Sequence, residues 1–197
     1  MSAYCYVVAG VVGEMLTELF CVHCPELRVK RDEMMRLAVS FGQGLQMTNI
    51  LKDVWEDRQA DTCWLPRSVF LGGEFELERL EELHNTEAFR AGMAELVSVA
   101  YYHLRRAFEY TCNVPTNEVG IRRFCIWALG FAVFTLRKIH ANPGFTSGEQ
   151  VKVSRKTVRA TVLTTNLALR SNRGLRLLFE FAASGLPLAN AEARRYL

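Results

Sequence analysis

The spacing of apolar residues along this chain constrains its fold more than any other sequence feature. Apolar side chains recur three and four residues apart along most of the 197 residues, and no segment alternates convincingly with the two-residue period of a strand. Pro66 and the Gly72-Gly73 pair predict an irregular connection over 61–73. Helices are predicted at 2–20, 30–58, 76–83, 86–112, 117–141, 148–169 and from residue 172 onward.

Such a set of helices buries its apolar faces by packing into one bundle. The length suits a single domain with a sizeable core, and the sequence contains no internal repeat, low-complexity tract or flexible linker. We therefore predict an all-α fold, a single helical bundle formed by residues 1–197.

Charge and cysteine content limit the class of ligand and the cellular location that the sequence favours. The net charge of +3 is compatible with an anionic substrate, but aromatic residues are not interleaved with the basic ones, which disfavours nucleic-acid binding. The six scattered cysteines and the lack of a secretory signal pattern favour free thiols in the cytoplasm. The apolar run from Phe124 to Leu136 is shorter than the ~20 residues of a membrane span, so it is predicted to be a buried core helix.

The segment from Gly42 to Asp57 has two distinct faces when it is drawn as a helix. Its polar face lies within an arc of roughly 100° at 3.6 residues per turn and comprises Gln46, Asn49, Asp53, Glu56 and Asp57. The opposite face comprises Met47, Ile50, Leu51 and Val54. A solvent-exposed amphipathic helix is the usual meaning of such a pattern.

Three features favour a binding site on this face instead. Asp53 and Asp57 are like charges four residues apart, an arrangement that destabilises an isolated helix. Gly42 and Gly44 each cost about 1 kcal/mol inside a helix, which suggests close approach by another group. Carboxylates one turn apart can hold a hard cation such as Mg²⁺, which bridges to phosphate oxygens.

Three segments resemble signatures of the squalene/phytoene synthase family. Residues 46–57 resemble its second aspartate-rich motif, and residues 4–13 resemble another signature segment of the family, in the right order and at the right distance. The segment from Arg123 to Trp127 resembles the Phe-Cys stretch of squalene synthases more than that of carotenoid enzymes. The resemblance implies an all-α isoprenoid synthase bundle that joins two prenyl diphosphates head to head, using Mg²⁺. It also implies reduction of the cyclopropyl intermediate by NADPH if the protein is a squalene synthase.

The resemblance also implies roles for individual residues. Asp53 and Asp57 would hold Mg²⁺ against the diphosphate of farnesyl diphosphate, and Tyr4 would act in the first half-reaction. Phe124 would line the cavity near the carbocation, where a cation–π contact is worth about 1–2 kcal/mol. The residues implied to contact substrate are Gly10, Gly13, Gln46, Asn49 and Lys52. Small residues such as these glycines also serve tight helix packing, and that alternative stays open.

A weaker match concerns NADPH. Lys152, Arg155 and Lys156 lie in a segment that loosely resembles the one associated with the NADPH phosphate in squalene synthases. A solvated basic helix face explains the same residues. No glycine-rich dinucleotide motif is present to support the cofactor independently.

One departure from the family pattern is substantial. The family's first aspartate-rich motif has no counterpart, because Asp32 has no carboxylate four residues later. The N-terminal helices of the family fold are therefore expected to be missing, and the chain alone is not expected to make squalene. Apolar faces are expected to be exposed around Val7, Val8, Val11 and Val12, so self-association is predicted.

Three alternatives remain open from the sequence. The product could be phytoene or dehydrosqualene, or the chain could be a non-catalytic helical scaffold. A peripheral contact with the inner face of the membrane is the alternative to a purely cytoplasmic location.

Overall fold

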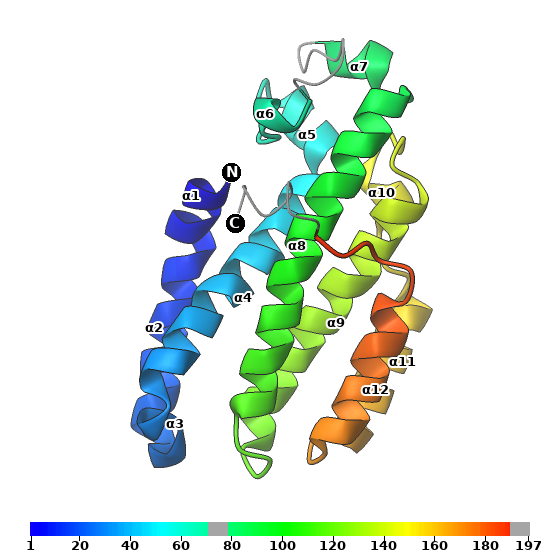
Figure 1. Cartoon of the computed structure of the whole chain (residues 1–197). Coiled ribbons are helices and arrows are strands. Elements are labelled where there is room, and N and C mark those ends of the chain that lie inside the picture. The colour runs from blue at the N-terminus through cyan, green and yellow to red at the C-terminus, as the bar shows by residue number, and fades with distance from the viewer. Residues whose placement is uncertain (71–78, 190–197) are drawn as a thin grey trace.

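A computed structural model describes residues 1–70 and 79–189, and every regular element within those ranges is a helix (Figure 1). The elements are α1 (Ser2–Cys5), a π-helical turn η1 (Tyr6–Gly10), α2 (Val11–His23), α3 (Pro25–Val29), α4 (Arg31–Lys52), α5 (Val54–Gln59), α6 (Arg67–Phe70), α7 (Leu80–Leu83), α8 (Glu87–Asn113), α9 (Val119–Ala141), α10 (Gly148–Val151), α11 (Arg155–Ala168) and α12 (Asn172–Ala183). The predicted all-α fold is confirmed.

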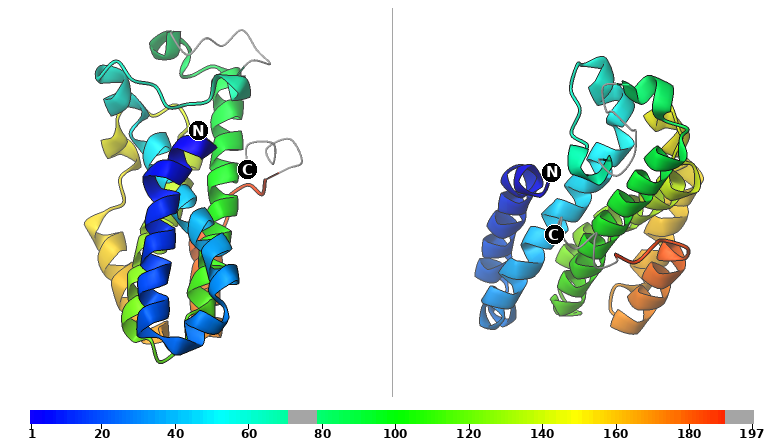
Figure 2. Two further views of the ribbon diagram at one scale, coloured as in Figure 1. Left: turned by 90° about the vertical axis from the view of Figure 1, so that its left-hand side faces the viewer. Right: turned by 45° about the horizontal axis from the view of Figure 1, so that its top comes forward.

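The long helices form one bundle with α4, α8 and α9 at its centre. Helix α4 packs against α2, α8 and α9, while α11 and α12 pack against the far side of α9. Seen from above, α1 and α2 form one edge of the bundle and α11 and α12 form the opposite edge (Figure 2). We call the continuous segment from Ser2 to His23, made of α1, η1 and α2, the first helix.

Two predicted helices are interrupted in the structure. The helix predicted at 30–58 breaks at Asp53, where the backbone leaves helical geometry (φ −95°, ψ 15°) between α4 and α5. The helix predicted at 148–169 divides into α10 and α11 because Ser154 starts a new helix, accepting a hydrogen bond from the Thr157 amide at 3.1 Å. The Ser-x-x-Thr spacing carried that capping signal in the sequence.

The connection predicted at 61–73 contains a short helix, α6, followed by residues outside the described range. It leaves α5 through Asp61, whose positive φ of 53° is a conformation that aspartate tolerates better than most residues. The helix predicted at 76–83 is described only from residue 79, and α7 covers Leu80–Leu83. The helix predicted at 86–112 is confirmed, with Thr86 as its N-cap.

A fully buried arginine joins four of the helices at one end of the bundle. The Arg122 guanidinium donates to the carbonyls of Leu169 (2.6 Å), Thr111 (3.1 Å) and Val114 (2.7 Å), and to Asn172 Oδ1 (2.6 Å). These carbonyls lie at the C-terminal ends of α8 and α11, where the helix dipole is negative. Burial lowers the pKa of Arg122, and the carbonyls compensate the charge that burial penalises.

Glycines set the distance between the first helix and α4. A Cβ at Gly13 would lie 2.5 Å from the Ala38 carbonyl oxygen, and a Cβ at Gly42 would lie within 3 Å of the Ala9 backbone. Only glycine permits this contact, so the spare volume on this face of the first helix is filled by α4. The pairs Gly13–Ala38 and Ala9–Gly42 also fix an antiparallel register between the two helices.

The outer side of the first helix carries an exposed apolar stripe. Its members are between 43% and 69% exposed, and they are Val7, Val8, Val11, Val12, Met15 and Leu19. The predicted exposure of the four valines is confirmed. The first helix and α9 are also the two helices in the described ranges that are long and apolar enough to cross a membrane by length and composition. Helix α9 packs among α4, α8, α11 and α12, as predicted for a core helix.

Candidate functional site

The acidic stripe keeps helical spacing across the break between α4 and α5. The Asp53 amide donates to the Asn49 carbonyl at 2.8 Å, and the Asp57 amide donates to the Asp53 carbonyl at 2.8 Å. These three residues therefore lie one turn apart on one face, as the helical wheel predicted. The predicted opposite face is buried throughout: Met47, Ile50, Leu51 and Val54 are at most 3% exposed.

Electrostatic repulsion is present within this stripe. The pKa of the Asp57 carboxyl is raised, first by partial burial and then by the negative charges of Asp53 and Glu56. The Lys52 ammonium forms an ion pair with Asp53, with 3.1 Å between Nζ and Oδ1. One ammonium therefore accompanies three carboxylates, and a bound cation would relieve the remaining repulsion.

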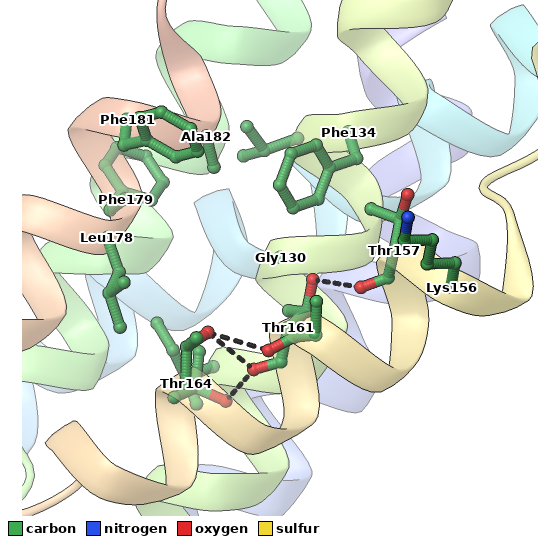
Figure 3. A pocket seen from close by; sticks show the side chains of 14 residues that line it. Gly130, Phe134, Lys156, Thr157, Thr161, Thr164, Leu178, Phe179, Phe181 and Ala182 are labelled. Carbon is green, nitrogen blue, oxygen red and sulfur yellow. Dashed lines mark hydrogen bonds between the residues drawn. The ribbon is translucent and has the colours of Figure 1, made fainter.

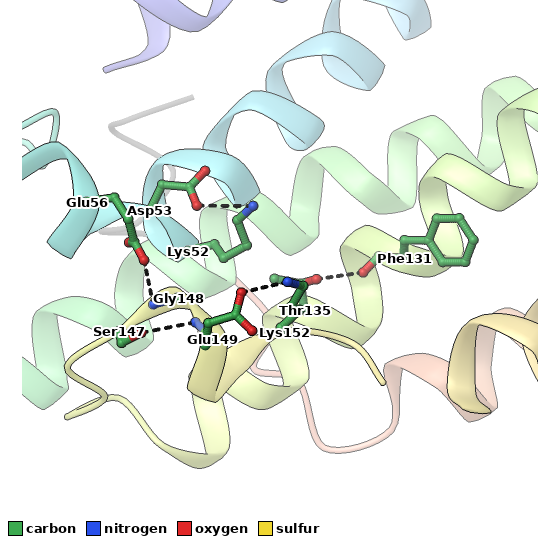
Figure 4. Close-up of polar contacts among 9 residues, drawn as sticks. All are labelled: Lys52, Asp53, Glu56, Phe131, Thr135, Ser147, Gly148, Glu149 and Lys152. Atoms are coloured by element: carbon green, nitrogen blue, oxygen red, sulfur yellow. Dashed lines mark hydrogen bonds and ion pairs between the residues drawn. The ribbon is translucent and has the colours of Figure 1, made fainter. Parts of the chain in front are cut away.

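Glu56 has a structural role that the helical wheel did not reveal. Its Oε1 accepts a hydrogen bond from the Gly148 amide at 3.0 Å (Figure 4). The neighbouring Trp55 indole donates to the Phe145 carbonyl. A Cβ at Gly148 would lie 2.9 Å from the same carboxylate oxygen, so glycine allows this approach. Glu56 therefore attaches α5 to α10 and does not extend the stripe of Asn49, Asp53 and Asp57.

The amide side chains of the stripe are available for a ligand. Gln46 is half-buried and Asn49 is exposed, and neither side chain has a hydrogen-bond partner among residues 1–70 and 79–189. Their oxygens and amide protons can orient a phosphate or its metal-bound water, provided that the ligand lies along this face of α4.

The predicted basic segment, residues 152–156, begins directly after α10, and α10 packs against α5. Lys152 follows α10 directly, and its ammonium pairs with Glu149 at 2.6 Å (Figure 4). Its carbonyl accepts from Lys138 Nζ at 2.6 Å. Arg155 and Lys156 are exposed in the first turn of α11. The fold thus brings this segment to the same end of the bundle as Asp53.

Tyr4 lies in α1, the end of the first helix, which also contacts α4. In the same region the Gln43 amide donates to the Ser2 carbonyl at 3.3 Å. The Tyr4 ring stacks on Trp64, with 4.1 Å between the ring centroids. The sequence pattern did not single out Trp64, because aromatic stacking between distant segments leaves no local signal.

Phe124 and Gly13 line the same small apolar cavity of about 40 Å³. The cavity lies between α2, α4, α8 and α9, and its wall also includes Phe41 and Tyr110. Phe41 precedes Asp53 by twelve residues, so Phe124 lies roughly 18 Å from the acidic stripe along α4. Phe124 lines this cavity from α9 while remaining 55% exposed, and the cavity lies beside the middle of α4 rather than beside the carboxylates.

The donor set is of the kind that Mg²⁺ uses. Within the described residues no group of three His, Cys, Asp or Glu side chains could hold a metal ion by itself. Mg²⁺ is commonly bound by one or two carboxylates together with waters and substrate phosphates. Asp53 and Asp57, with the amide oxygens of Asn49 and Gln46, fit that requirement only in combination with a phosphate ligand.

One buried polar group escaped the sequence analysis. His103 on α8 is 4% exposed, and both of its ring nitrogens are buried without a hydrogen-bond partner in the described part of the chain. Burial lowers its pKa to about 4, so the ring is neutral at physiological pH. The sequence did not indicate that His103 is buried, because its surroundings are formed by two helices, α4 and α8, that are distant in the sequence.

Comparison with known proteins identifies the family of this chain. The profile of the squalene/phytoene synthase family matches residues 1–157, which include all three signature segments. The chain is 32% identical over 144 residues to a squalene synthase of Gibberella zeae, a match that covers 71% of this chain and 30% of that protein. It is 29% identical over 136 residues to a 15-cis-phytoene synthase of Enterobacter agglomerans, covering 69% of this chain and 41% of that protein.

A phytoene synthase of Thermus thermophilus is 38% identical over 93 residues, covering 47% of this chain and 29% of that protein. The chain thus spans well under half the length of these relatives. Both kinds of synthase are similar to it at comparable identity, and the acidic stripe lies within the matched residues. With its all-helical bundle and its stripe of two aspartates and two amides, the chain belongs to the squalene/phytoene synthase family, whose members are prenyltransferases.

Proposed function

We propose that this chain forms the diphosphate-binding part of a squalene synthase-like farnesyltransferase. In this reaction two molecules of farnesyl diphosphate are joined head to head through presqualene diphosphate, and NADPH reduces the intermediate to squalene. The observation that carries the proposal is the one-turn spacing of Asn49, Asp53 and Asp57, with a pKa at Asp57 raised first by burial and then by the charges of Asp53 and Glu56.

Each residue of the stripe has a chemical role in this proposal. Asp53 and Asp57 hold Mg²⁺, which when bound neutralises the diphosphate and favours its departure. Lys52 adds a positive charge beside Asp53, and the amides of Asn49 and Gln46 orient the phosphate oxygens. The proposal requires that these groups be fixed before the reaction, because preorganised charge stabilises a developing ion more than mobile charge does.

Tyr4 and Phe124 act on the apolar part of the substrate. The Tyr4 hydroxyl relays a proton or stabilises the carbocation. Phe124, with Gly13, lines the cavity beside the middle of α4, where it excludes water from a prenyl chain. The spacing of roughly 18 Å between that cavity and Asp53 favours a long substrate over a small one.

The reducing step rests on the basic segment. Lys152, Arg155 and Lys156 are proposed to contact the NADPH phosphate, supported by the position of α10 against α5. Phytoene or dehydrosqualene synthesis is the second candidate, favoured by the phytoene synthases among the similar proteins. Product analysis of a full-length enzyme that contains this segment, with and without NADPH, separates the two.

Calorimetric titration tests the binding step directly. With Mg²⁺ and a non-hydrolysable farnesyl diphosphate analogue, Asp53→Asn or Asp57→Asn is expected to weaken binding at least tenfold, about 1.4 kcal/mol. Asp61→Asn is the matched control, because it removes a carboxylate outside the stripe and asparagine also tolerates a positive φ. Unchanged affinity in both stripe variants would favour a non-catalytic scaffold and reject the proposal.

Tyr4→Phe and Phe124→Ala test the roles on the apolar substrate. In a full-length enzyme that contains this segment, both are expected to lower turnover while Mg²⁺-dependent diphosphate binding stays near normal. Thermal melts run beside the kinetics identify any loss of folding. Normal turnover in both variants would remove these two residues from the proposed mechanism.

A further inference from the structure

A second, larger cavity lies on the opposite side of α9 from Phe124. It has a volume of about 380 Å³ and lies between α9, α11 and α12, with one side open to solvent (Figure 3). At about 30 Å³ per heavy atom, the volume share of a water molecule, it accommodates roughly a dozen heavy atoms. Its volume is within the range of small-molecule sites, and none of the residues proposed for farnesyl diphosphate lines it.

The threonines of α11 give this cavity an apolar wall although they are polar residues. Thr161 donates its hydroxyl proton to the Thr157 carbonyl (2.8 Å), Thr164 to Ala160 (2.8 Å) and Thr165 to Thr161 (2.6 Å), all within α11 (Figure 3). Each threonine has one hydroxyl proton, and each donates that proton to a carbonyl of its own helix. These three hydroxyls therefore have no proton left to donate to a ligand.

The wall on α9 is shaped by a glycine. A Cβ at Gly130 would lie 2.9 Å from the Thr161 methyl carbon, so glycine allows α9 and α11 to approach here. The rings of Phe134 and Phe179 add aromatic surface from α9 and α12. The interior therefore suits a hydrocarbon chain and offers few partners to a polar molecule.

The charges at the rim of this cavity are positive. Lys156 lines the cavity from the first turn of α11 and is its one charged lining residue within the described part of the chain. Arg137 lies at the same rim, because its guanidinium donates to the Ala182 carbonyl at 3.1 Å and lies 6.0 Å from the centroid of the Phe134 ring. No acidic residue is among the described residues that line the cavity.

We propose that this cavity binds a single-chain anionic amphiphile, with about a dozen carbons between α9, α11 and α12 and the anionic headgroup against Lys156. An apolar interior with a cation at its rim is complementary to that chemistry and to neither a neutral lipid nor a sugar. Two kinds of ligand combine an anionic headgroup with an apolar chain: a fatty carboxylate and a prenyl diphosphate. The cavity is separate from the stripe of Asn49, Asp53 and Asp57 and does not depend on the function proposed for that stripe. It shares Lys156 with the segment proposed for the NADPH phosphate, so an anionic amphiphile bound here would compete with that contact.

Titration with dodecanoate and with dodecanol tests the headgroup preference. Dodecanoate is expected to bind the 197-residue chain at least tenfold more tightly than the uncharged dodecanol, below the concentration at which dodecanoate forms micelles. Lys156→Gln is expected to remove that difference. The matched control is Arg170→Gln, which removes one positive charge beyond the end of α11 and away from the lining residues.

A filling variant tests the location. Ala160 lines the cavity from an exposed position on α11, so Ala160→Phe is expected to fill the space and weaken binding of both ligands at least tenfold without unfolding the helix. Leu167→Phe is its control, because Leu167 is 83% exposed on the same helix and does not line the cavity. Thermal melts verify that both variants are folded.

A competition experiment without Mg²⁺ separates the two sources. Displacement of dodecanoate by farnesyl diphosphate assigns the cavity to a prenyl diphosphate, and lack of displacement assigns it to a fatty carboxylate. Asp53→Asn is expected to leave dodecanoate binding unchanged, so failure of the stripe and failure of this cavity are distinguishable. Equal binding of dodecanoate and dodecanol, or an affinity unchanged by Lys156→Gln or by Ala160→Phe, overturns the proposal.

Discussion

The first helix and α9 are similar in length and apolar composition, but their surroundings are opposite. Both satisfy the length and hydropathy of a membrane-spanning helix. Helix α9 packs between α4 and α8 on one side and α11 and α12 on the other. The first helix packs mainly on α4 and leaves its apolar stripe exposed. Equal hydrophobicity therefore does not imply equal burial, because burial depends on how many neighbours the bundle provides.

The two helices also differ in how polar groups attach them. Helix α9 contains Arg122, whose guanidinium joins the ends of α8 and α11. The first helix is held by glycine contacts at Gly13 and Gly42 and by the hydrogen bond between Thr17 and Tyr110 at 2.9 Å. Substitutions in α9 should therefore destabilise the whole bundle, whereas most substitutions on the outer side of the first helix should not.

Arg122→Met is expected to have the largest effect. It leaves buried carbonyls without a donor, and we expect the free energy of unfolding to fall by about 3–5 kcal/mol. Arg123→Met is the matched control, because the neighbouring Arg123 is exposed and donates to the Asn166 side chain at 3.1 Å rather than to buried carbonyls. Urea denaturation measures both. Equal losses in the two variants would contradict the role of Arg122 as the link between the four helices.

The same substitution in the two helices gives the most direct comparison. Leu129 in α9 is completely buried, so Leu129→Ala should lower the free energy of unfolding by about 2–5 kcal/mol. Leu19 in the first helix is 57% exposed, and Leu19→Ala should change it by about 0.5 kcal/mol or less. If Leu19→Ala were as destabilising as Leu129→Ala, the stripe would be covered in solution.

Thiol modification compares the local stability of the two helices. Burial raises the pKa of the Cys5 thiol to about 11 and that of Cys125 to about 12, so each buried thiol reacts only when its helix opens. The first helix lies at the edge of the bundle and should open more readily. Alkylation followed by mass spectrometry should find Cys5 modified at least tenfold faster than Cys125, with exposed Cys63 faster than both.

The alkylation experiment has an internal control. In denaturant the three cysteines should react at similar rates, because the difference arises from the folded structure. Equal native-state rates at Cys5 and Cys125 would show that the first helix is held as firmly as α9.

The exposed stripe should promote self-association or contact with a membrane surface. Exposed apolar patches of several hundred Å² are uncommon on soluble monomers. Val8→Glu is expected to weaken self-association at least tenfold in light-scattering measurements, whereas Val29→Glu, outside the stripe, should have little effect. Sedimentation with lipid vesicles checks the membrane alternative. A monomeric wild-type chain that does not sediment with vesicles would contradict both.

The accuracy of the sequence predictions depended on whether the signal was local. The long helices were predictable because their apolar periodicity is local, and the one-turn spacing of Asn49, Asp53 and Asp57 followed from the same periodicity. The break at Asp53 was not predictable from the sequence, because α5 is attached to α10 through Glu56 and Gly148, which are 92 residues apart. The stacking of Tyr4 on Trp64 was not predictable for the same reason.

The sequence by itself determined the all-α class, the family and the acidic stripe, because each depends on patterns that are local within one helix or one segment. Only the tertiary structure decided which helices enclose α9 and which one covers the inner side of the first helix. It also decided that Glu56 attaches α5 to α10, and that Lys156 lies at the rim of a cavity whose walls come from three helices. Contacts between distant segments depend on how the helices pack, and no local pattern records that packing.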